Sequence, residues 1–199
     1  MGLELEYDYG QTPLDEDEKE GLLISSIMTR EDLNEFEQNN IESAVQWTLG
    51  LKLSEKKILS ETFIKKLHQE MFGEVWKWAG SFRRTNKNLG VDKNTIAVEL
   101  KKLLDDAYYW LENKTFHPDE FAIRIKHRVV SIHLFPNGNG RHSRLLADVI
   151  VSRIFKKDVF TWGSLQTQDN SASIRKQYID SLRKADSGEY DELIRFARS

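Results

Sequence analysis

Apolar residues recur at three- and four-residue steps along most of this chain, a repeat that favours amphipathic α-helices. Residues suited to begin a helix stand in front of these stretches, such as Thr29 as a cap and Pro118 at a first helical position. We predict seven helices, which begin near Thr29, Ser60, Thr95, Pro118, Gly140, Ser171 and just after Gly188. The chain is therefore expected to be mainly α.

One stretch between these helices, from Trp76 to Asn94, lacks the helical repeat. Glycines, asparagines and basic residues replace the apolar stripe there, which favours a hairpin or flap. We place this flap at about residues 83–91. The predicted architecture is a helical bundle with one β-hairpin flap.

The length of 199 residues fits one compact domain with an arm. We assign residues 1–28 to an acidic N-terminal arm and residues 29–199 to a single domain. The chain has no cysteine, which excludes disulfides, thiol nucleophiles and cysteine-ligated zinc, and favours a reducing compartment. Because the sequence has neither a secretory signal nor an apolar stretch long enough to span a membrane, we expect a cytoplasmic protein.

The formal net charge of −3 conceals an uneven layout. Residues 1–20 hold eight acidic residues and one lysine, whereas residues 124–144 hold five lysines and arginines and no acid. A solvated helix face is the ordinary explanation for such a basic cluster. The residues inside this cluster favour a different explanation.

A loop between two predicted helices has the backbone of a phosphate site. Pro136 cannot continue the preceding helix, because it lacks an N–H group and its ring clashes with the turn before it. Gly138 and Gly140 follow and allow several N–H groups to converge at a helix N-terminus. Phe135 is expected to anchor the loop in the core.

Charged and polar side chains flank this loop. Arg141 and Arg144 are three residues apart and share one helix face, where guanidinium groups can grip phosphate oxygens. His133, at the end of the preceding helix, has the near-neutral pKa that suits a general base. Asn137 and Asn139 offer amide groups to a phosphate or to a hydrated metal ion.

The loop resembles the signature of the Fic domain family, H-x-F-x-[D/E]-G-N-G-R-x-x-R. Seven fixed positions match in one ungapped run, a highly specific match, and they are His133, Phe135, Gly138, Asn139, Gly140, Arg141 and Arg144. The likeness extends over about residues 45–197. With Asn34-Glu35-Phe36-Glu37-Gln38 upstream, the form HLFPNGNGRHSR is most similar to the subgroup called mobile mystery protein B.

The resemblance implies a Fic-type helical fold and transfer of AMP from ATP to a Ser, Thr or Tyr hydroxyl of a target protein. His133 would be the general base, and Phe135 would be structural. The phosphate chain would be held by Gly138, Asn139, Gly140, Arg141 and Arg144. Asn137 stands where the family has an acid that binds Mg²⁺, so the metal would be bound more weakly, by an amide oxygen.

The resemblance also bears on target binding and regulation. The flap would dock the target by strand addition, with Arg84, Lys87, Asn88 and Leu89 at the docking segment. Many family members carry an inhibitory glutamate in the motif [S/T]-x-x-x-E-[G/N]. Glu42 could serve in this role, although Gln38 and Ser43 break the motif. The alternative is restraint by a separate antitoxin-like protein, with a toxin-like effect when restraint is lifted.

Other functions compete with AMP transfer, namely a different nucleotidyl or phosphoryl transfer of the Fic family and nucleic-acid binding. Two helices joined by a glycine-containing turn with clustered arginines superficially resemble a helix-turn-helix, which would make the chain a nucleic-acid binder. The acidic total charge argues against this. A kinase-like Fic relative has lysine at the position of Gly140, so glycine there favours AMP transfer over γ-phosphate transfer.

The remaining histidines have ordinary explanations. We expect His68 and His117 at the surface, and His127 in a structural or surface position. His142 is expected on the helix surface, where it could reach phosphate. Tyr178 is expected mainly in the core.

Overall fold

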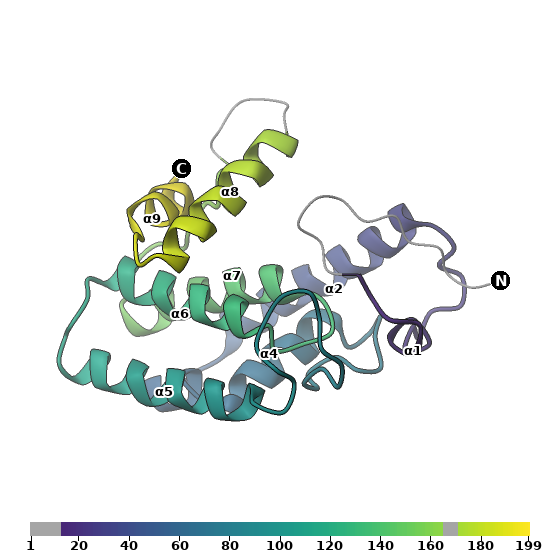
Figure 1. Ribbon diagram of the computed structural model, residues 1–199, viewed down its shortest axis with the longest axis horizontal. Coiled ribbons are helices and arrows are strands. Elements are labelled where there is room, and N and C mark those ends of the chain that lie inside the picture. Colours follow the sequence, from purple (N-terminus) through teal and green to yellow (C-terminus); the bar gives the residue numbers. More distant parts are fainter. Residues whose placement is uncertain (1–12, 165–170) are drawn as a thin grey trace.

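The computed structural model describes residues 13–164 and 171–199, and its regular structure is helical (Figure 1). The elements are α1 (Glu16–Lys19), α2 (Arg30–Gly50), α3 (Glu55–Ile58), α4 (Glu61–Phe72), α5 (Ile96–Glu112), α6 (Pro118–Ile132), α7 (Asn139–Val149), a π-helical turn η1 (Ile150–Ile154), α8 (Ser171–Asp186) and α9 (Asp191–Arg198). The prediction of a mainly α fold is confirmed.

Local sequence explains where the main helices begin. Thr29 Oγ1 accepts a hydrogen bond from the Asp32 N–H at 3.1 Å, and the Asp32 carboxylate accepts one from the Thr29 N–H at 3.0 Å. This reciprocal capping satisfies two donors that a helix start leaves unpaired. Ser60 caps the Phe63 N–H at 3.2 Å, and Pro118 is the first residue of α6. These starts agree with the sequence-based prediction.

Helix α6 lies in the middle of the bundle and packs against α5, α7 and α9, while α4 packs against α2 and α7. In Figure 1, α8 and α9 lie together above the layer that holds α5 and α6. One continuous hydrophobic core joins the elements, and Leu67, Ile125 and Val129 are among its fully buried members. The α6–α7 connection and α8 line one pocket, which is described below.

The segment between α4 and α5 contains no β-strand; over the described residues only an isolated bridge, Leu22 with Trp76, has β pairing. The hairpin predicted for residues 83–91 is therefore not confirmed. Side chains hold its two limbs together instead of a backbone ladder. The Arg83 guanidinium donates to the carbonyls of Thr85, at 2.8 Å, and of Val91. We call residues 83–91 the flap from here on.

The acidic arm is described only from residue 13 onward, and its first twelve residues lie outside the described part. Residues 13–28 lie against the domain. Leu14 and Ile27 are buried, and the arm exchanges backbone hydrogen bonds with the segment before the flap, from Leu23 N–H to Val75 O at 2.9 Å and from Lys77 N–H to Gly21 O at 2.8 Å. This part of the arm is thus attached to the domain surface.

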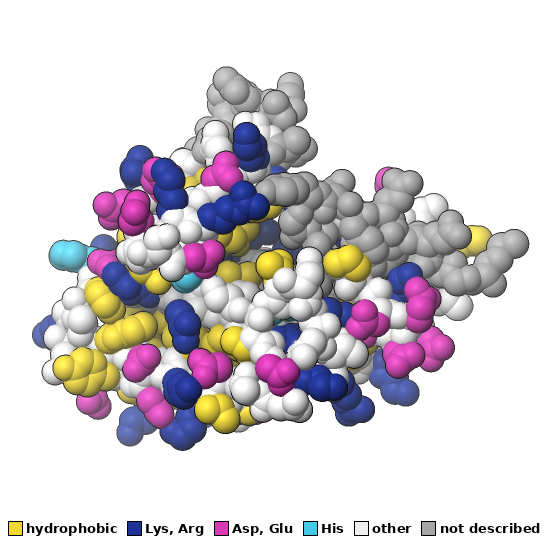
Figure 2. All heavy atoms as spheres, in the orientation of Figure 1, with side chains coloured by type: hydrophobic (Ala, Val, Ile, Leu, Met, Phe, Trp, Pro, Cys, Tyr) yellow, Lys and Arg dark blue, Asp and Glu magenta, His cyan; other side chains and the backbone are white. Residues whose placement is uncertain are grey.

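Charges of both signs cover the outer surface. Figure 2 shows acidic and basic side chains interspersed over the face that carries α5 and α6. Large exposed hydrophobic side chains, such as Met28 and Tyr109, occur at widely separated positions of the chain. Within residues 13–164 and 171–199, none of the helices combines the length and apolar character needed to cross a bilayer.

Candidate active site

The α6–α7 loop has the tight geometry that its sequence predicts. Helix α6 ends at Ile132, and His133 follows in the left-handed region with φ of 59°. Gly138 caps α7 with φ of 76°, and a Cβ added there would lie 2.6 Å from the Phe72 ring. Glycine is therefore required at this position for both conformation and space.

The loop is held from within by Asn139, whose side chain is 3% exposed. Its Oδ1 accepts from the Phe135 N–H at 3.0 Å, and its Nδ2 donates to the Phe135 carbonyl at 2.8 Å. Both amide atoms are thus engaged inside the loop. Asn139 therefore supports the α6–α7 loop through its side chain.

His68, which the sequence analysis placed at the surface, is fully buried beneath this loop. Its Nδ1 accepts from the Gly80 N–H at 3.0 Å, so its Nε2 carries the proton and donates to the Asn137 carbonyl at 3.1 Å. Its ring stacks on Phe135 with 3.7 Å between centroids. The signal was present in the sequence, because Ile64, His68 and Phe72 recur every four residues as a second apolar stripe on α4.

The predicted base, His133, is 5% exposed and lines the pocket described below. Burial and the charge of Arg83 lower its pKa to about 4, although a hydrogen bond with the Val130 backbone works in the opposite direction. The imidazole is therefore neutral at pH 7. Arg83 fixes the His133 backbone, because its Nε donates to the His133 carbonyl at 2.6 Å.

A pocket of about 1100 Å³ opens in front of the loop. Parts of α2, the flap, α6, the loop, α7, α8 and α9 line it. The predicted site residues around it are Asn88, Leu89, His133, Asn137, Gly138, Asn139, Gly140, Arg141 and Arg144. Tyr178, expected mainly in the core, also lines this pocket while it packs against the core.

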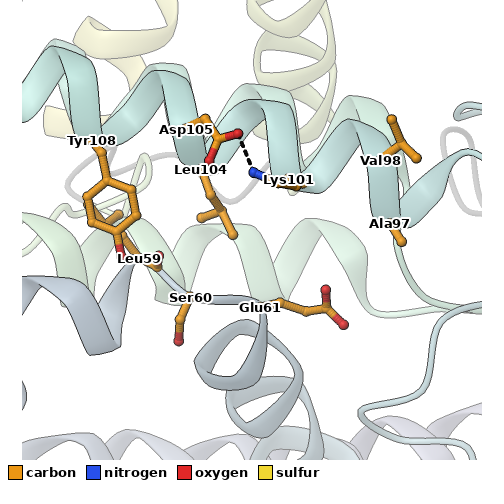
Figure 3. Close-up of a pocket in the computed structure, with 9 residues that line it drawn as sticks. All are labelled: Leu59, Ser60, Glu61, Ala97, Val98, Lys101, Leu104, Asp105 and Tyr108. Carbon is orange, nitrogen blue, oxygen red and sulfur yellow. Dashed lines mark hydrogen bonds and ion pairs between the residues drawn. The ribbon is translucent and has the colours of Figure 1, made fainter.

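A second hollow, of about 560 Å³, lies between the α3–α4 junction and α5 (Figure 3). Its polar groups are already paired. Lys101 Nζ donates to Asp105 Oδ2 at 2.6 Å, and the Tyr108 hydroxyl donates to the Leu59 carbonyl at 2.9 Å. No residue of the α6–α7 loop lines it. The larger pocket is therefore the candidate site.

The first arginine of the loop, Arg141, is held by an acid that the sequence analysis did not single out. Its Nη1 donates to Glu37 Oε2 at 2.7 Å, and the other oxygen of Glu37 accepts from Trp76 Nε1 at 2.6 Å. Glu37 is 3% exposed. Glu37 shares the buried side of α2 with Leu33 and Asn40, but the sequence near it does not reveal its role, since its partners are far away in the sequence.

The second arginine, Arg144, lies beside α8. Its guanidinium is 5.6 Å from the centre of the Tyr178 ring. The Tyr178 hydroxyl in turn lies 2.6 Å from Nζ of Lys126, which is fully buried, and burial holds the pKa of this lysine well below its usual range. Helix α8 thus closes one side of the pocket.

The residue predicted to bind metal, Asn137, lines the pocket next to the glycines. Its Oδ1 accepts from the Gly138 N–H at 2.6 Å. No group of three or more acidic or histidine side chains suited to a metal lies in the described part of the chain. One protein oxygen beside the pocket suits only an ion that takes most of its ligands from other sources, as Mg²⁺ does.

The flap residues divide into two groups. Asn88 and Leu89 are exposed and line the pocket, and Arg84 is exposed outside it. The Lys87 side chain is only 4% exposed, because it contacts the arm. Glu42 does not line the pocket: it is exposed on α2 and accepts a hydrogen bond from Gln38 at 3.0 Å.

The other histidines are structural or exposed. His142 was expected at the surface but is fully buried, and its Nε2 donates to the Ile64 carbonyl at 3.0 Å. His127 is buried and lines the pocket, and its Nε2 lies 2.8 Å from Asp186 Oδ1 on α8. His117 is exposed, as expected.

Comparisons with known proteins agree with this loop and fold. Residues 58–151 match the Fic/DOC family. The chain is 27% identical to a protein adenylyltransferase Fic of Aedes aegypti over 160 residues, which cover 78% of this chain and 30% of that protein. It is 30% identical to a protein adenylyltransferase Fic of Drosophila grimshawi over 137 residues, which cover 67% and 26%. The chain thus spans about a third or less of the length of these curated relatives.

Solved structures share the fold. Fic-1 of C. elegans, residues 134–508, superposes with a TM-score of 0.66 at 23% identity, over 90% of this chain and 50% of that one. BepC of Bartonella tribocorum, solved with bound AMPPNP, superposes with a TM-score of 0.67 at 16% identity, over 91% and 95%. The fold and the loop together define a helical domain of the Fic type. Within the chain, residues 58–151 are the part that matches the Fic/DOC family.

Proposed function

We propose that this protein transfers AMP from ATP to a Ser, Thr or Tyr hydroxyl of a target protein. One observation carries the proposal: a buried, neutral His133 shares a pocket with the N-terminus of α7 and with Arg141 and Arg144. A base, a phosphate cradle and two cations are the groups that this reaction needs. The names of the Aedes and Drosophila relatives support the same activity.

The phosphate chain of ATP would bind at the start of α7. The first N–H groups of a helix lack partners inside the helix, and the helix dipole favours an anion there. Gly140 leaves open space at this position, since no atom lies within 4 Å of an added Cβ. Arg141 and Arg144 would supply charge-assisted hydrogen bonds to the phosphates.

The transfer step would begin with His133. Its neutral ring takes the proton from the target hydroxyl, and the hydroxyl oxygen bonds to the α-phosphorus as the bond from that phosphorus to the bridging oxygen breaks. Pyrophosphate leaves, and AMP remains on the target. The negative charge of bound ATP would raise the pKa of His133 above about 4 and so strengthen this base.

Mg²⁺ would supply charge neutralisation on the phosphates when bound. Asn137 would hold it through its side-chain oxygen, a role supported by its position in the lining of the pocket. We expect Asn137→Asp to lower the Mg²⁺ concentration needed for half-maximal transfer. An unchanged metal titration would remove Asn137 from this role.

Target docking would use the flap, whose residues Asn88 and Leu89 stand at the pocket mouth. An extended segment of the target can pair with such a backbone and bring its hydroxyl toward His133. When the target is essential, the consequence would be toxin-like. Because Glu42 lies outside the pocket, restraint by a separate antitoxin-like protein is the stronger proposal for regulation.

The nucleic-acid alternative has less support. A helix-turn-helix needs an exposed recognition helix after the turn. Here that helix is α7, and Asn139, His142, Ser143, Leu145 and Leu146 on it are all buried. Retention on DNA that falls steeply with salt would revive this alternative.

The deciding experiment compares ATP labelled at the α-phosphate with ATP labelled at the γ-phosphate, each incubated with the protein, a lysate and Mg²⁺. AMP transfer predicts protein label from the α-phosphate alone. Label from the γ-phosphate alone would overturn the proposal in favour of kinase chemistry.

His133→Ala should lower the rate of labelling by about 10²–10⁴-fold, the usual contribution of a positioned base. His117→Ala is the matched control, because His117 is exposed and does not line the pocket. Its labelling rate should equal that of the unaltered protein. Equal rates for both variants would show that His133 is not the base.

A further inference from the structure

The acidic arm contacts the flap through one flap lysine, Lys87. Lys87 Nζ donates to Glu18 Oε2 at 2.5 Å and to Asp15 Oδ2 at 2.8 Å. The other oxygen of Glu18 accepts from the Thr85 hydroxyl at 3.3 Å. Two arm carboxylates therefore contact two flap residues.

The Lys87–Glu18 pair is buried, unlike most pairs between lysine and acid, whereas the Asp15 side chain is 47% exposed. The side chains of Lys87 and Glu18 are 4% and 10% exposed. The hydrogen bond from Lys87 holds the pKa of Asp15 below its usual value. Breaking a buried pair by removing one partner leaves a charge uncompensated, which is strongly unfavourable.

The arm is itself anchored to the domain. Glu18 O accepts from Trp78 Nε1 at 2.9 Å, and its side chain accepts from the Asp15 N–H at 2.9 Å. Gly21 is pressed against the Trp78 side chain, where an added Cβ would lie 2.6 Å from a ring atom. Lys87 thus meets a fixed pair of carboxylates. Figure 2 shows further acidic side chains over α1.

The flap connects Lys87 to the candidate base, His133. Lys87 directly precedes Asn88 and Leu89 at the pocket mouth. Gly90, with φ of 98°, approaches His133 so closely that an added Cβ would lie 2.5 Å from the His133 Cβ. The far limb is tied down as well, since the Val91 N–H donates to the Ile132 carbonyl at 3.3 Å. The position of Lys87 therefore sets how residues 88–90 stand beside His133.

We propose that Glu18 and Asp15 are positioning residues for target docking. They hold Lys87 and thereby keep the flap in the orientation that receives the target next to His133. Both lie outside residues 58–151, the part that matches the family. We call the contact of Lys87 with Asp15 and Glu18 the clasp. The role in docking rests on the proposed AMP transfer, whereas the clasp does not.

The clasp is tested first by limited trypsin digestion of the full chain. Trypsin must take the lysine side chain into its own pocket, so a clasped Lys87 resists cleavage. The double variant Asp15→Asn, Glu18→Gln should be cut after Lys87 about tenfold faster, the ratio that corresponds to about 1.4 kcal/mol. Asp17→Asn, Glu20→Gln is the control, because it removes the same charge from exposed positions of the same arm.

Thermal unfolding of both double variants separates clasp release from global unfolding. Both should melt cooperatively above the digestion temperature. Equal cleavage after Lys87 in the unaltered protein and in the Asp15→Asn, Glu18→Gln variant would overturn the clasp.

Docking is tested by kinetics of AMP transfer to the protein that is isolated from the lysate as the one labelled from the α-phosphate of ATP. The Asp15→Asn, Glu18→Gln variant should raise the KM for the target about tenfold and leave the affinity for AMPPNP within about twofold. If the two residues only stabilised the fold, the variant would not raise the KM for the target while keeping its affinity for AMPPNP. An unchanged KM for the target, with faster cleavage, would overturn the docking role and keep the clasp.

A double-mutant cycle with Lys87→Met completes the test. If the carboxylates act through Lys87, the triple variant should be no worse than the worse of its two parents. Fully additive losses would overturn the pairing. If the unaltered protein transfers no AMP, the proposed function and the docking role are both wrong. The trypsin digestion still tests the clasp, because it does not depend on AMP transfer.

Discussion

At the residue scale, the pocket depends on polar side chains that are buried and fully paired. Glu37 is the main example. It orients Arg141 toward the pocket while its other oxygen is held by Trp76. A carboxylate satisfied on both sides restricts the guanidinium to one orientation, which is the preorganisation that phosphate binding rewards.

We expect Glu37→Gln to lower the free energy of unfolding by about 1–3 kcal/mol, because a glutamine has one acceptor oxygen for two donors and leaves a buried group unpaired. Affinity for AMPPNP should fall as Arg141 loses its fixed orientation. Urea unfolding and a ligand titration measure the two effects. Glu35→Gln, an exposed acid on the same helix, should change the free energy of unfolding by no more than about 0.5 kcal/mol. Equal stability of the two variants would contradict this account.

At the scale of elements, the α6–α7 loop uses two glycines for different purposes. Gly138 has a positive φ and no space for a side chain, whereas Gly140 lies in the first turn of α7 with open space around it. One glycine therefore builds the loop. The other keeps the pocket open at the N-terminus of the helix.

We expect alanine at these two positions to have opposite effects on stability. Gly138→Ala forces a methyl group against the Phe72 ring and should lower the melting temperature. Gly140→Ala should leave it unchanged or slightly higher, since alanine favours a helix by up to about 1 kcal/mol. Its methyl group should nevertheless weaken AMPPNP binding. Thermal unfolding measures the melting temperatures, and ligand titration measures the affinity for AMPPNP. A Gly140→Ala variant with unchanged affinity would show that the phosphates bind elsewhere.

At the scale of the whole molecule, the interior contains several histidines that are neutral in the folded protein. Burial lowers the pKa of His142 and of His133 to about 4, and it lowers the pKa of His68 well below its usual value. The unfolded chain binds protons at these sites near pH 6.5. Between pH 6.5 and 4 the unfolded state thus binds more protons, so stability falls as the pH falls. Asp148, whose pKa burial raises to about 6, opposes this in part.

We expect the melting temperature to fall steadily from pH 7 to pH 4. His142→Leu should flatten this slope, because it removes a group that can contribute up to about 3 kcal/mol of pH-dependent stability. The measurement is thermal unfolding at a series of pH values. His117→Leu, at an exposed position, is the control. An unaltered slope in the His142 variant would assign the acid sensitivity to other groups.

Local features made much of the fold predictable. Thr29, Ser60 and Pro118 begin helices through contacts within a few residues, so the chain near them is sufficient to place α2, α4 and α6. The loop from His133 to Arg144 is also one continuous stretch. Its family could therefore be inferred from the sequence, and its residues could be assigned together to one site.

The remaining features depend on partners far away in the sequence. His68 is buried because it meets Phe135 and Asn137, and Glu37 because it meets Trp76 and Arg141. The two limbs of the flap are joined by the Arg83 side chain, which donates to the carbonyls of Thr85 and Val91. The sequence by itself determined the helices and the α6–α7 loop, which arise from local propensity and an ungapped motif. Only the tertiary structure decided which polar groups are buried and how the arm clasps Lys87, because those contacts form only when distant segments pack.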